Sequence, residues 1–448
     1  MSLSAKSPPK KTITRLSQTV KFVLRDKRRM EQLIKQLNYW NDSLDKMTTR
    51  LEQESSRRRL RTYLSTGDSS QLQCLEAAAA LFKHQDLERM AKARNVIEQG
   101  YRGEKPHESE APDSDPASEY RLTMEQLQWQ GIPYQTDQVR AMAKLGQENI
   151  IVDWRGCQDD TWRRENPAAF RCRTENLTKI LNTDLRPLGI SILHCVGYLD
   201  QNINVTGYAF RLPPDAEPGK TPVTLHQVLT RSKSAKDIPD LGERFDLAKA
   251  LVSTVFEIHN IGWMHKNIQP KNVIFWPKPN TRDEPDLRKP YLMGFDISRP
   301  YQPGEVSEKP LSRPEDDLYR HPEYKGSHSR SFRPSFDMYS LGVILYEIGL
   351  WRNVAQQKQA SSSRPLPQTH NSDPHFIEKM VMSGSVMELK RYTGTRFQDA
   401  VMACLSREFD AFWVEQKEQE LGDRHKQLRT YLGQVQTKVV DAIAVCNA

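Results

Sequence analysis

The stretch "GWMHKNIQPKNVIFW", from Gly262 to Trp276, decides the fold of this chain of 448 residues. Three more segments follow it: "YLMGFDISRP" at 291–300, "YRHPEY" at 319–324 and "SFDMYSLGVILYEIG" at 335–349. One such segment alone carries little weight, because short polar and apolar runs recur by chance. Four of them in one order and at plausible spacing indicate a single architecture for the second half of the chain.

In this order the segments resemble four motifs of the protein kinases: the catalytic loop H-R-D-L-K-P-x-N, the D-F-G segment, the A-P-E segment and the apolar helix after it. The resemblance covers roughly residues 135–425 and implies a two-lobed, protein-kinase-like α+β domain. Its N-lobe is expected at 131–213 and its C-lobe at 214–448. The departures from the family pattern look most like fungal kinase-like domains that follow HeLo-type helices.

The pattern of apolar residues agrees with this fold. "NIIVDWR" at 149–155 and "NVTGYAFRL" at 204–212 are rich in β-branched and aromatic residues, which favours strands. Residues 243–263 repeat apolar positions with helical spacing, and residues 335–351 are strongly apolar, which predicts a buried helix. Strands that precede helices are the order of elements in a two-lobed kinase fold.

Two positions of the opening stretch have lost the charges that phosphoryl transfer uses. Asn267 stands where the kinase loop has its Asp, which accepts or orients the proton of the substrate hydroxyl. A neutral amide binds a hydroxyl but is not a base at ordinary pH. Gln269 stands where the loop has a Lys, and it brings no charge to the moving phosphoryl group. The resemblance therefore implies a degenerate catalytic site at Asn267 and Gln269.

The set of residues that would hold magnesium is incomplete as well. Asn272 matches the metal-binding Asn of the kinase loop, but Gly294 stands where D-F-G has its metal-binding Asp. Asp296 lies two residues later and becomes a metal ligand only if the backbone shifts. His265 and Pro270 match residues that shape the loop. We therefore expect no metal and no cofactor, with ATP and magnesium, held through Asn272 and Asp296, as the alternative.

The same resemblance assigns four further residues. Arg155 falls at the position of the strand Lys that binds phosphate, and Glu175 is the candidate for its helical partner. The planar fork of an Arg differs from the point charge of a Lys, and an exposed strand end is the alternative for Arg155. Asp337 resembles the buried Asp that receives backbone amides of the catalytic loop. Glu323 resembles the A-P-E glutamate, which pairs with an Arg that the sequence leaves unassigned.

The N-terminal part of the chain is basic. Residues 1–62 contain 16 Lys and Arg against 6 Asp and Glu, about +10, although the whole chain carries +8. Residues 13–60 show an a/d repeat of apolar side chains, and 71–98 show a second helical pattern. These observations predict a basic α-helical region at 1–99, followed by an acidic, Pro-rich linker at 100–130.

"FVLRDKRRMEQLIKQLNYWNDSLDKM" at 22–47 resembles the later helices of HeLo-type (prion-inhibition and propagation) bundles. We expect no counterpart of the first helices of that bundle, so membrane permeabilisation does not follow from the resemblance. A basic amphipathic surface favours self-association, a protein partner or an anionic membrane surface; a solvated helical face is the alternative. No zinc finger, RNP motif or helix-turn-helix spacing supports nucleic-acid binding.

These features together predict a pseudokinase that signals or acts as a scaffold, with the N-terminal helices as its output or interaction module. The resemblance implies fungal incompatibility or immunity-type signalling, and the alternative is an atypical active, ATP-dependent Ser/Thr protein kinase. No apolar run reaches the ~20 residues of a membrane helix, and six cysteines without close pairs indicate reduced thiols. A cytoplasmic location is therefore expected.

Overall fold

The computed structural model describes most of the chain beyond its N-terminal part. The described residues are 35–36, 39–40, 64, 67–81, 83–103, 119–133, 139–156, 164–182, 189–202, 205–217, 219–281, 283–301, 315–325, 331–356, 377, 386–413 and 421–447. By their contacts the residues form two units, Met1–Leu60 and Arg61–Ala448. In the first unit the described residues are helical, and the rings of Tyr39 and Trp40 lie edge to face, 6.2 Å apart. The rest of the helix expected over 13–60 lies outside the described residues.

A helical hairpin opens the second unit. Helix α3 spans Ser69–Leu81 and α4 spans Gln85–Gly103, where the sequence predicts one helix over 71–98. Lys83 has a φ of 59°, in the left-handed region, and a residue in this conformation commonly ends a helix. The prediction of one continuous helix is therefore wrong, because the chain turns back at Lys83 and the two halves pack on each other.

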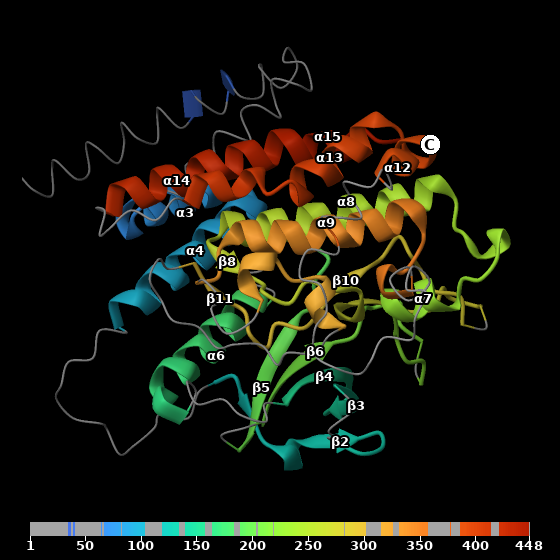
Figure 1. The fold of residues 1–448 in the computed structure, drawn as a ribbon. Helices are drawn as coiled ribbons and strands as arrows, with labels where there is room; N and C mark the ends of the chain where they lie inside the picture. Colours follow the sequence, from blue (N-terminus) through green and yellow to red (C-terminus); the bar gives the residue numbers. More distant parts are fainter. Residues whose placement is uncertain are drawn as a thin grey trace, which may run out of the picture. The chain divides into compact units, whose positions relative to one another are not determined.

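A six-stranded sheet forms the N-terminal lobe (Figure 1). Its strands are β1 (Arg121–Leu122), β2 (Leu127–Trp129), β3 (Arg140–Leu145), β4 (Glu148–Gly156), β5 (Cys195–Asn202) and β6 (Val205–Arg211). Their order is β1-β5-β6-β4-β3-β2, antiparallel except for the β1–β5 pair. β4 and β6 confirm the strands predicted at 149–155 and 204–212. β1 and β2 lie inside the range 100–130, for which the sequence predicts a linker, so the sheet begins at Arg121.

The two faces of β4 contribute to different cores. Ile150 and Val152 pack on one face of the sheet, in a cluster with side chains of β2 and β3. Ile151 lies on the other face, in the main core with α6 (Pro167–Leu181). Because side chains alternate along a strand, Asp153 follows on the side of Ile151. A buried carboxylate in this position needs a partner, and the side chain of Arg140 provides it.

The C-terminal lobe is mainly helical and is built around one buried helix. All residues of α9 (Pro334–Leu350) are buried, which confirms the prediction for 335–351. α8 (Leu241–Asn260) confirms the helix predicted over 243–263. Among the described residues the lobe also contains α7 (Leu225–Arg231), α12 (Val386–Thr393), α13 (Thr395–Leu405), α14 (Leu421–Val435) and α15 (Asp441–Ala444), with a π-helical turn at Gln436–Val440.

Short strands and 3-10 turns connect these helices. The strands are β7 (Val223–Thr224), β8 (Trp263–Met264), β9 (Val273–Phe275), β10 (Tyr291–Leu292) and β11 (Arg299–Pro300). The 3-10 turns are Met124–Gln126, Ala235–Asp237, Pro270–Asn272, Asp316–Leu318, Pro322–Tyr324 and Glu408–Trp413. The protein thus has the two-lobed α+β fold that the sequence predicts. Among the described residues, no helix combines the length and the hydropathy needed to cross a membrane.

Candidate functional site

The segment 265–272 connects β8 to β9, and one carboxylate fixes its first residues. Asp337, in α9, has no solvent exposure. Its Oδ2 accepts a hydrogen bond from the backbone N–H of His265 and its Oδ1 accepts one from that of Lys266, both at 2.8 Å. Lys266 has a φ of 67°, a left-handed conformation that costs free energy and that these bonds help to stabilise. Asp337 therefore lies against the backbone of the loop and fixes two of its N–H groups.

Two ring side chains extend this network. His259 Nε2 lies 3.2 Å from Asp337 Oδ2, and His259 Nδ1 lies 3.1 Å from the hydroxyl oxygen of Tyr431 in α14. All three side chains are buried, and a buried charge is tolerated only when it is hydrogen-bonded. Sequence analysis misses both rings: Tyr431 is 172 positions from His259, and no motif marks it.

His265 is a buried, uncharged side chain that shapes the loop. Its ring packs against Phe295 with 4.5 Å between centroids. Nδ1 accepts a hydrogen bond from the backbone N–H of Asn267 at 3.2 Å, so Nε2 carries the proton and donates to the Met293 carbonyl at 3.1 Å. Burial lowers the pKa of His265 to about 4. At neutral pH the neutral ring therefore ties the loop to the segment 291–300.

Asn267 and Gln269 form a chain of neutral amides that ends on a carboxylate. Gln269 Nε2 donates to Asn267 Oδ1 at 2.7 Å, and Asn267 Nδ2 donates to Asp296 Oδ1 at 3.0 Å. Both ends of the Asn267 amide are thereby engaged, and neither amide can take up a proton at ordinary pH. The structure thus brings Asn267, Gln269 and Asp296 together.

Asn272 and Gly294 lie in direct contact. Asn272 Nδ2 donates to the backbone oxygen of Asn267 at 2.9 Å. Gly294 has a φ of 84°, and a Cβ atom there would lie 2.8 Å from Asn272 Oδ1 and closer still to Cγ and Nδ2. A side chain at 294 would therefore have to displace Asn272. The glycine is required both by its backbone conformation and by its neighbour.

Arg140 and Asp153 fill the space between the sheet and Asn272. Arg140, on β3, donates from Nη2 to Asn272 Oδ1 and from Nη1 to the backbone oxygen of Lys271, both at 2.9 Å. Its Nε forms an ion pair with Asp153 Oδ1 at 2.9 Å. Asp153 Oδ2 accepts a hydrogen bond from the backbone N–H of Gly294 at 2.8 Å. Sequence analysis misses both residues; the available signal is an acid inside the apolar run "NIIVDW".

A magnesium ion with a nucleotide phosphate does not fit this donor set. The amide oxygen of Asn272 already accepts a guanidinium hydrogen bond, and the D-F-G acid position is Gly294. The carboxylate of Asp153 has an arginine on one oxygen and a backbone N–H on the other, whereas Mg²⁺ needs carboxylate oxygens that are free to coordinate. In the part of the chain that the structure describes, no group of three or more His, Cys, Asp or Glu side chains could hold a metal.

The pairing of Arg155 with Glu175 stays a prediction. The backbone of Arg155 lies opposite Thr206 of β6, and its side chain is outside the described part of the structure. Glu175 is half-buried on α6, where the Tyr198 hydroxyl donates a long hydrogen bond of 3.5 Å to its Oε1. Asp153, two positions before Arg155, is a residue of β4 whose carboxylate does reach the segment 291–300, at the backbone N–H of Gly294.

The structure supplies the arginine that pairs with Glu323. Glu323 lies in the 3-10 turn Pro322–Tyr324, and its Oε1 contacts Nη2 of Arg407, which lies just after α13. Arg407 Nε also contacts Asp410 Oδ2 at 3.3 Å. Asp410 in turn lies 2.9 Å from His321 Nε2. These pairs join the "YRHPEY" segment to the helices at the end of the chain.

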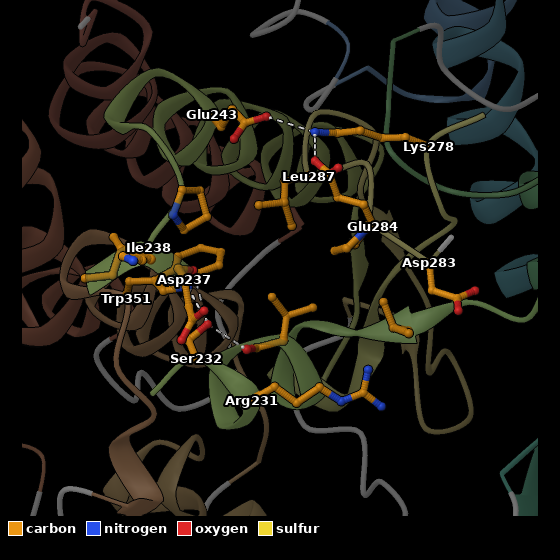
Figure 2. Close-up of a pocket in the computed structure, with 15 residues that line it drawn as sticks. Arg231, Ser232, Asp237, Ile238, Glu243, Lys278, Asp283, Glu284, Leu287 and Trp351 are labelled. Carbon is orange, nitrogen blue, oxygen red and sulfur yellow. Dashed lines mark hydrogen bonds and ion pairs between the residues drawn. The ribbon is translucent and has the colours of Figure 1, made fainter. Parts of the chain in front are cut away.

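A pocket lies beside α7 and the beginning of α8, away from the segment 265–272 (Figure 2). Its volume of about 370 Å³ is within the range of ligand pockets. On one wall Lys278 lies between Glu243 and Glu284; on another, Trp351 Nε1 donates to Ser232 Oγ at 3.0 Å. These polar groups are engaged with one another, and none of the predicted site residues is among the described residues that line the pocket. The segment 265–272 therefore remains the candidate site.

Two family models match this chain, one at its N-terminal end and one over most of the remaining residues. A family model described as HeLo, prion-inhibition and propagation, matches residues 2–75. A second one, described as Domain of unknown function (DUF7580), matches residues 162–443, more than half of the chain. The chain belongs to the DUF7580 family. The DUF7580 match contains the loop and α9 but begins after β4, so Arg140 and Asp153 lie outside it.

Curated relatives of this DUF7580 chain are protein kinases. Calcium-dependent protein kinase 11 of Arabidopsis thaliana is 27% identical over 152 residues, and calcium-dependent protein kinase SK5 of Glycine max is 30% identical over 148 residues. The aligned residues are 31% and 30% of this chain, and 28% and 27% of those proteins. The chain thus spans less than a third of the length of the curated relatives it matches. It is a kinase-like domain preceded by a HeLo-type region.

Proposed function

We propose that the DUF7580 domain of this chain is a pseudokinase, which does not transfer phosphate and which regulates the HeLo-type helices before it. The observation that carries the proposal is the guanidinium of Arg140 on the amide oxygen of Asn272, at 2.9 Å. In the kinase mechanism the corresponding oxygen binds a metal ion. Here it binds a cation of the chain itself, so the domain works without ATP or magnesium.

Three losses of charge support the same proposal. Phosphoryl transfer depends almost entirely on positioning and on stabilising charge in the transition state. Asn267 and Gln269 replace a base and a cation by amides, and Gly294 replaces a metal ligand. Each loss raises the barrier, although groups that act as one unit do not add. The amides instead bond to each other and to Asp296, which stabilises the loop as a structural element.

The α3–α4 hairpin supports a regulatory link between the two regions. The HeLo match ends at residue 75, inside α3, which packs on α4. α4 packs on α6, and its Arg94 donates from Nη1 to the backbone oxygen of Ile261 at 3.4 Å. Gly262 has a φ of 79°, and a Cβ atom there would overlap the Arg94 guanidinium. In this proposal a change at the loop reaches α4 through β8 and the Ile261–Gly262 turn that Arg94 contacts, because close-packed contacts transmit strain.

The basic region of residues 1–62, which the sequence predicts to be helical, is the output module in this proposal. Its charge of about +10 favours an acidic protein partner or an anionic membrane, whereas self-association would use its apolar a/d repeat. Nucleic acid is not expected, because the sequence carries no nucleic-acid-binding motif. Release of this region in the cytoplasm, in incompatibility or immunity-type signalling of a fungus, is the setting in which such a module acts. Flotation of the full-length chain with anionic and neutral liposomes tests the membrane arm. Equal flotation with both would exclude an electrostatic membrane target.

Phosphotransfer is the direct test of the pseudokinase. Full-length protein is incubated with magnesium and radiolabelled ATP beside an Asn272→Ala variant. We expect no label above that of the variant, and no rise in melting temperature when ATP and magnesium are added, because only a bound ligand stabilises the folded state. Label that depends on Asn272 would overturn the proposal.

An atypical active kinase is the second candidate, favoured by the position of Asp296. Its Oδ1 lies 3.0 Å from Asn267 Nδ2, so a carboxylate stands beside the position of the catalytic base. Such an enzyme would use ATP and magnesium with Asn272 and Asp296 as ligands. Asp296→Asn discriminates between the candidates: it should abolish label incorporation if the kinase is active, and should change only stability in a pseudokinase.

A further inference from the structure

Arg140 lies among oxygen atoms that belong to two parts of the fold. Its Nε, Nη1 and Nη2 face Asp153 Oδ1, the backbone oxygen of Lys271 and Asn272 Oδ1, each at 2.9 Å. These oxygens are a carboxylate, a peptide carbonyl and an amide. We propose that they form a cation-binding site that the chain fills with its own guanidinium. The inference rests on the proposed function only in taking Asn272 as free of a nucleotide-bound metal.

The site suits a guanidinium better than an ammonium or a metal ion. Two nitrogen atoms of the planar fork donate hydrogen bonds to separate oxygens, and the third lies in an ion pair with a carboxylate; a guanidinium can make such contacts in one plane. A compact ammonium would reach fewer of these oxygens. Magnesium would require a near-octahedral set of free oxygens, but the second oxygen of Asp153 is engaged by the backbone N–H of Gly294 at 2.8 Å. The ligand class is therefore a guanidinium-type cation.

Burial makes this site costly to leave empty. The side chains of Arg140 and Asp153 are 15% and 6% exposed. Without the guanidinium the carboxylate stays buried and unpaired, which is far less favourable than losing a pair at the surface. Because Arg140 belongs to β3 whereas Lys271 and Asn272 belong to the loop, the filled site also holds the two lobes together. An added cation of the right shape should then restore this contact.

Chemical rescue tests the inference on the full-length chain. Arg140→Ala should lower the melting temperature by about 10 °C, as expected for breaking a buried ion pair in a domain of this size. N-ethylguanidinium, which contains the atoms that this substitution removes, should restore about half of the loss at millimolar concentration, by binding the folded state. Ethylammonium, or sodium chloride at equal ionic strength, should restore none. The melting temperature of the wild-type chain should not rise with N-ethylguanidinium or with ethylammonium.

Arg211→Ala is the matched control. Arg211 pairs with Glu148 on the same sheet, but these side chains are 45% and 48% exposed. We expect a fall of less than about 2 °C and no rescue. The proposal is overturned if N-ethylguanidinium fails to stabilise Arg140→Ala, or if ethylammonium or the control variant shows the same gain.

A double-mutant cycle provides a test if Arg140→Ala does not fold. Arg140→Met removes the cation, and Asp153→Asn removes the charge while it keeps an acceptor for the N–H of Gly294. The double variant should melt closer to wild type than Arg140→Met does, because no charge is left unpaired. If the double variant loses as much melting temperature as the two single variants together, the two residues do not interact and the proposed cation site is wrong. Phosphotransfer by the wild-type chain would overturn the proposed function alone, because melting reports the cation site whether or not the domain is active.

Discussion

The two sides of the segment 265–272 are held by different kinds of interaction. On the side of α9, a buried side chain binds backbone: Asp337 accepts two N–H groups of the loop and is flanked by His259. On the side of the sheet, contacts between side chains are added to backbone contacts: Asn272 accepts from Arg140, which also donates to the Lys271 carbonyl and pairs with Asp153. We call these the scaffold side and the cleft side.

The difference teaches that the shape of the loop and the chemistry of the cleft depend on separate residues. Without Asp337, two buried N–H groups would lose their acceptor whatever the domain does with phosphate. On the cleft side the backbone of the loop contributes one acceptor, the carbonyl of Lys271, and the other contacts of Arg140 are with side chains. A kinase-like fold can therefore persist while Gly294 and Asn272 take contacts that have no part in phosphoryl transfer.

Among the substitutions considered, the largest loss of stability should come from one on the scaffold side. Asp337→Ala should lower the free energy of unfolding by about 4 kcal/mol, because it leaves two buried N–H groups and His259 without an acceptor. Urea denaturation gives this value. Asp246→Ala is the control on α8: Asp246 is 47% exposed and lies 3.7 Å from Arg288, so its loss should cost less than about 0.5 kcal/mol. Equal losses would mean that the scaffold side does not depend on Asp337.

The helix that carries Asp337 also contains a buried acid, Glu347, whose pKa is raised. Glu347, in α9, has no solvent exposure, and its Oε1 accepts from the Tyr319 hydroxyl and the Val354 N–H, both at 2.8 Å. Burial raises the pKa of Glu347 to about 8, whereas the unfolded chain has the ordinary value of 4.5. The folded state then binds the proton more tightly, so its stability is full below the unfolded pKa and is lost as pH rises through about 8.

Comparison of wild type with Glu347→Gln isolates this contribution. The free energy of unfolding of wild type should fall by about 3 kcal/mol relative to the variant between pH 5 and pH 8, because Gln stays neutral. The measurement is urea denaturation at several pH values. Glu388→Gln, which removes a surface ion pair with Arg352, should track wild type. Parallel pH profiles of wild type and Glu347→Gln would show that the buried carboxyl is not protonated.

The sequence predicts the scaffold side better than the cleft side for a physical reason. Long apolar runs such as α9 have one stable environment, the interior, and "SFDMYSLGVILYEIG" carries its Asp within that run. Arg140 meets the loop only through the tertiary fold, since it lies 132 positions from Asn272, and Asp153 is similarly far along the chain from Gly294. No local pattern encodes such a contact. Arg407 escapes prediction in the same way, being 84 positions from Glu323.

Short or irregular elements account for the other differences. β1 and β2 contain two and three residues, too few for an alternation of apolar and polar side chains, so they read as part of a linker. The turn at Lys83 uses a left-handed conformation that nothing in the residue type announces. In each case the tertiary partner, the neighbouring strand or the other half of the hairpin, decides the structure.

A smaller effect should come from the packing of the cleft side. Gly294→Ala places a Cβ atom against the side chain of Asn272 and should cost about 2 kcal/mol of unfolding free energy. Gly146→Ala is the matched control, because Gly146 has a φ of 60° but nothing lies within 4 Å of an added Cβ; it should cost about 1 kcal/mol from backbone strain alone. The difference in urea midpoints measures the clash. Equal costs would show that Asn272 yields without penalty.

The smallest effect should come from the pair of Glu323 and Arg407, and it sets the scale for the cleft. Their side chains are 24% and 32% exposed, so water screens them. A double-mutant cycle with Glu323→Gln and Arg407→Gln should give a coupling of about 0.5 kcal/mol that decreases as salt is added. The buried pair of Arg140 and Asp153 should keep its coupling at high salt, since ions do not reach it. Equal salt dependence of the two cycles would mean that solvent enters the cleft, and the distinction between an internal cation and a surface ion pair would be lost.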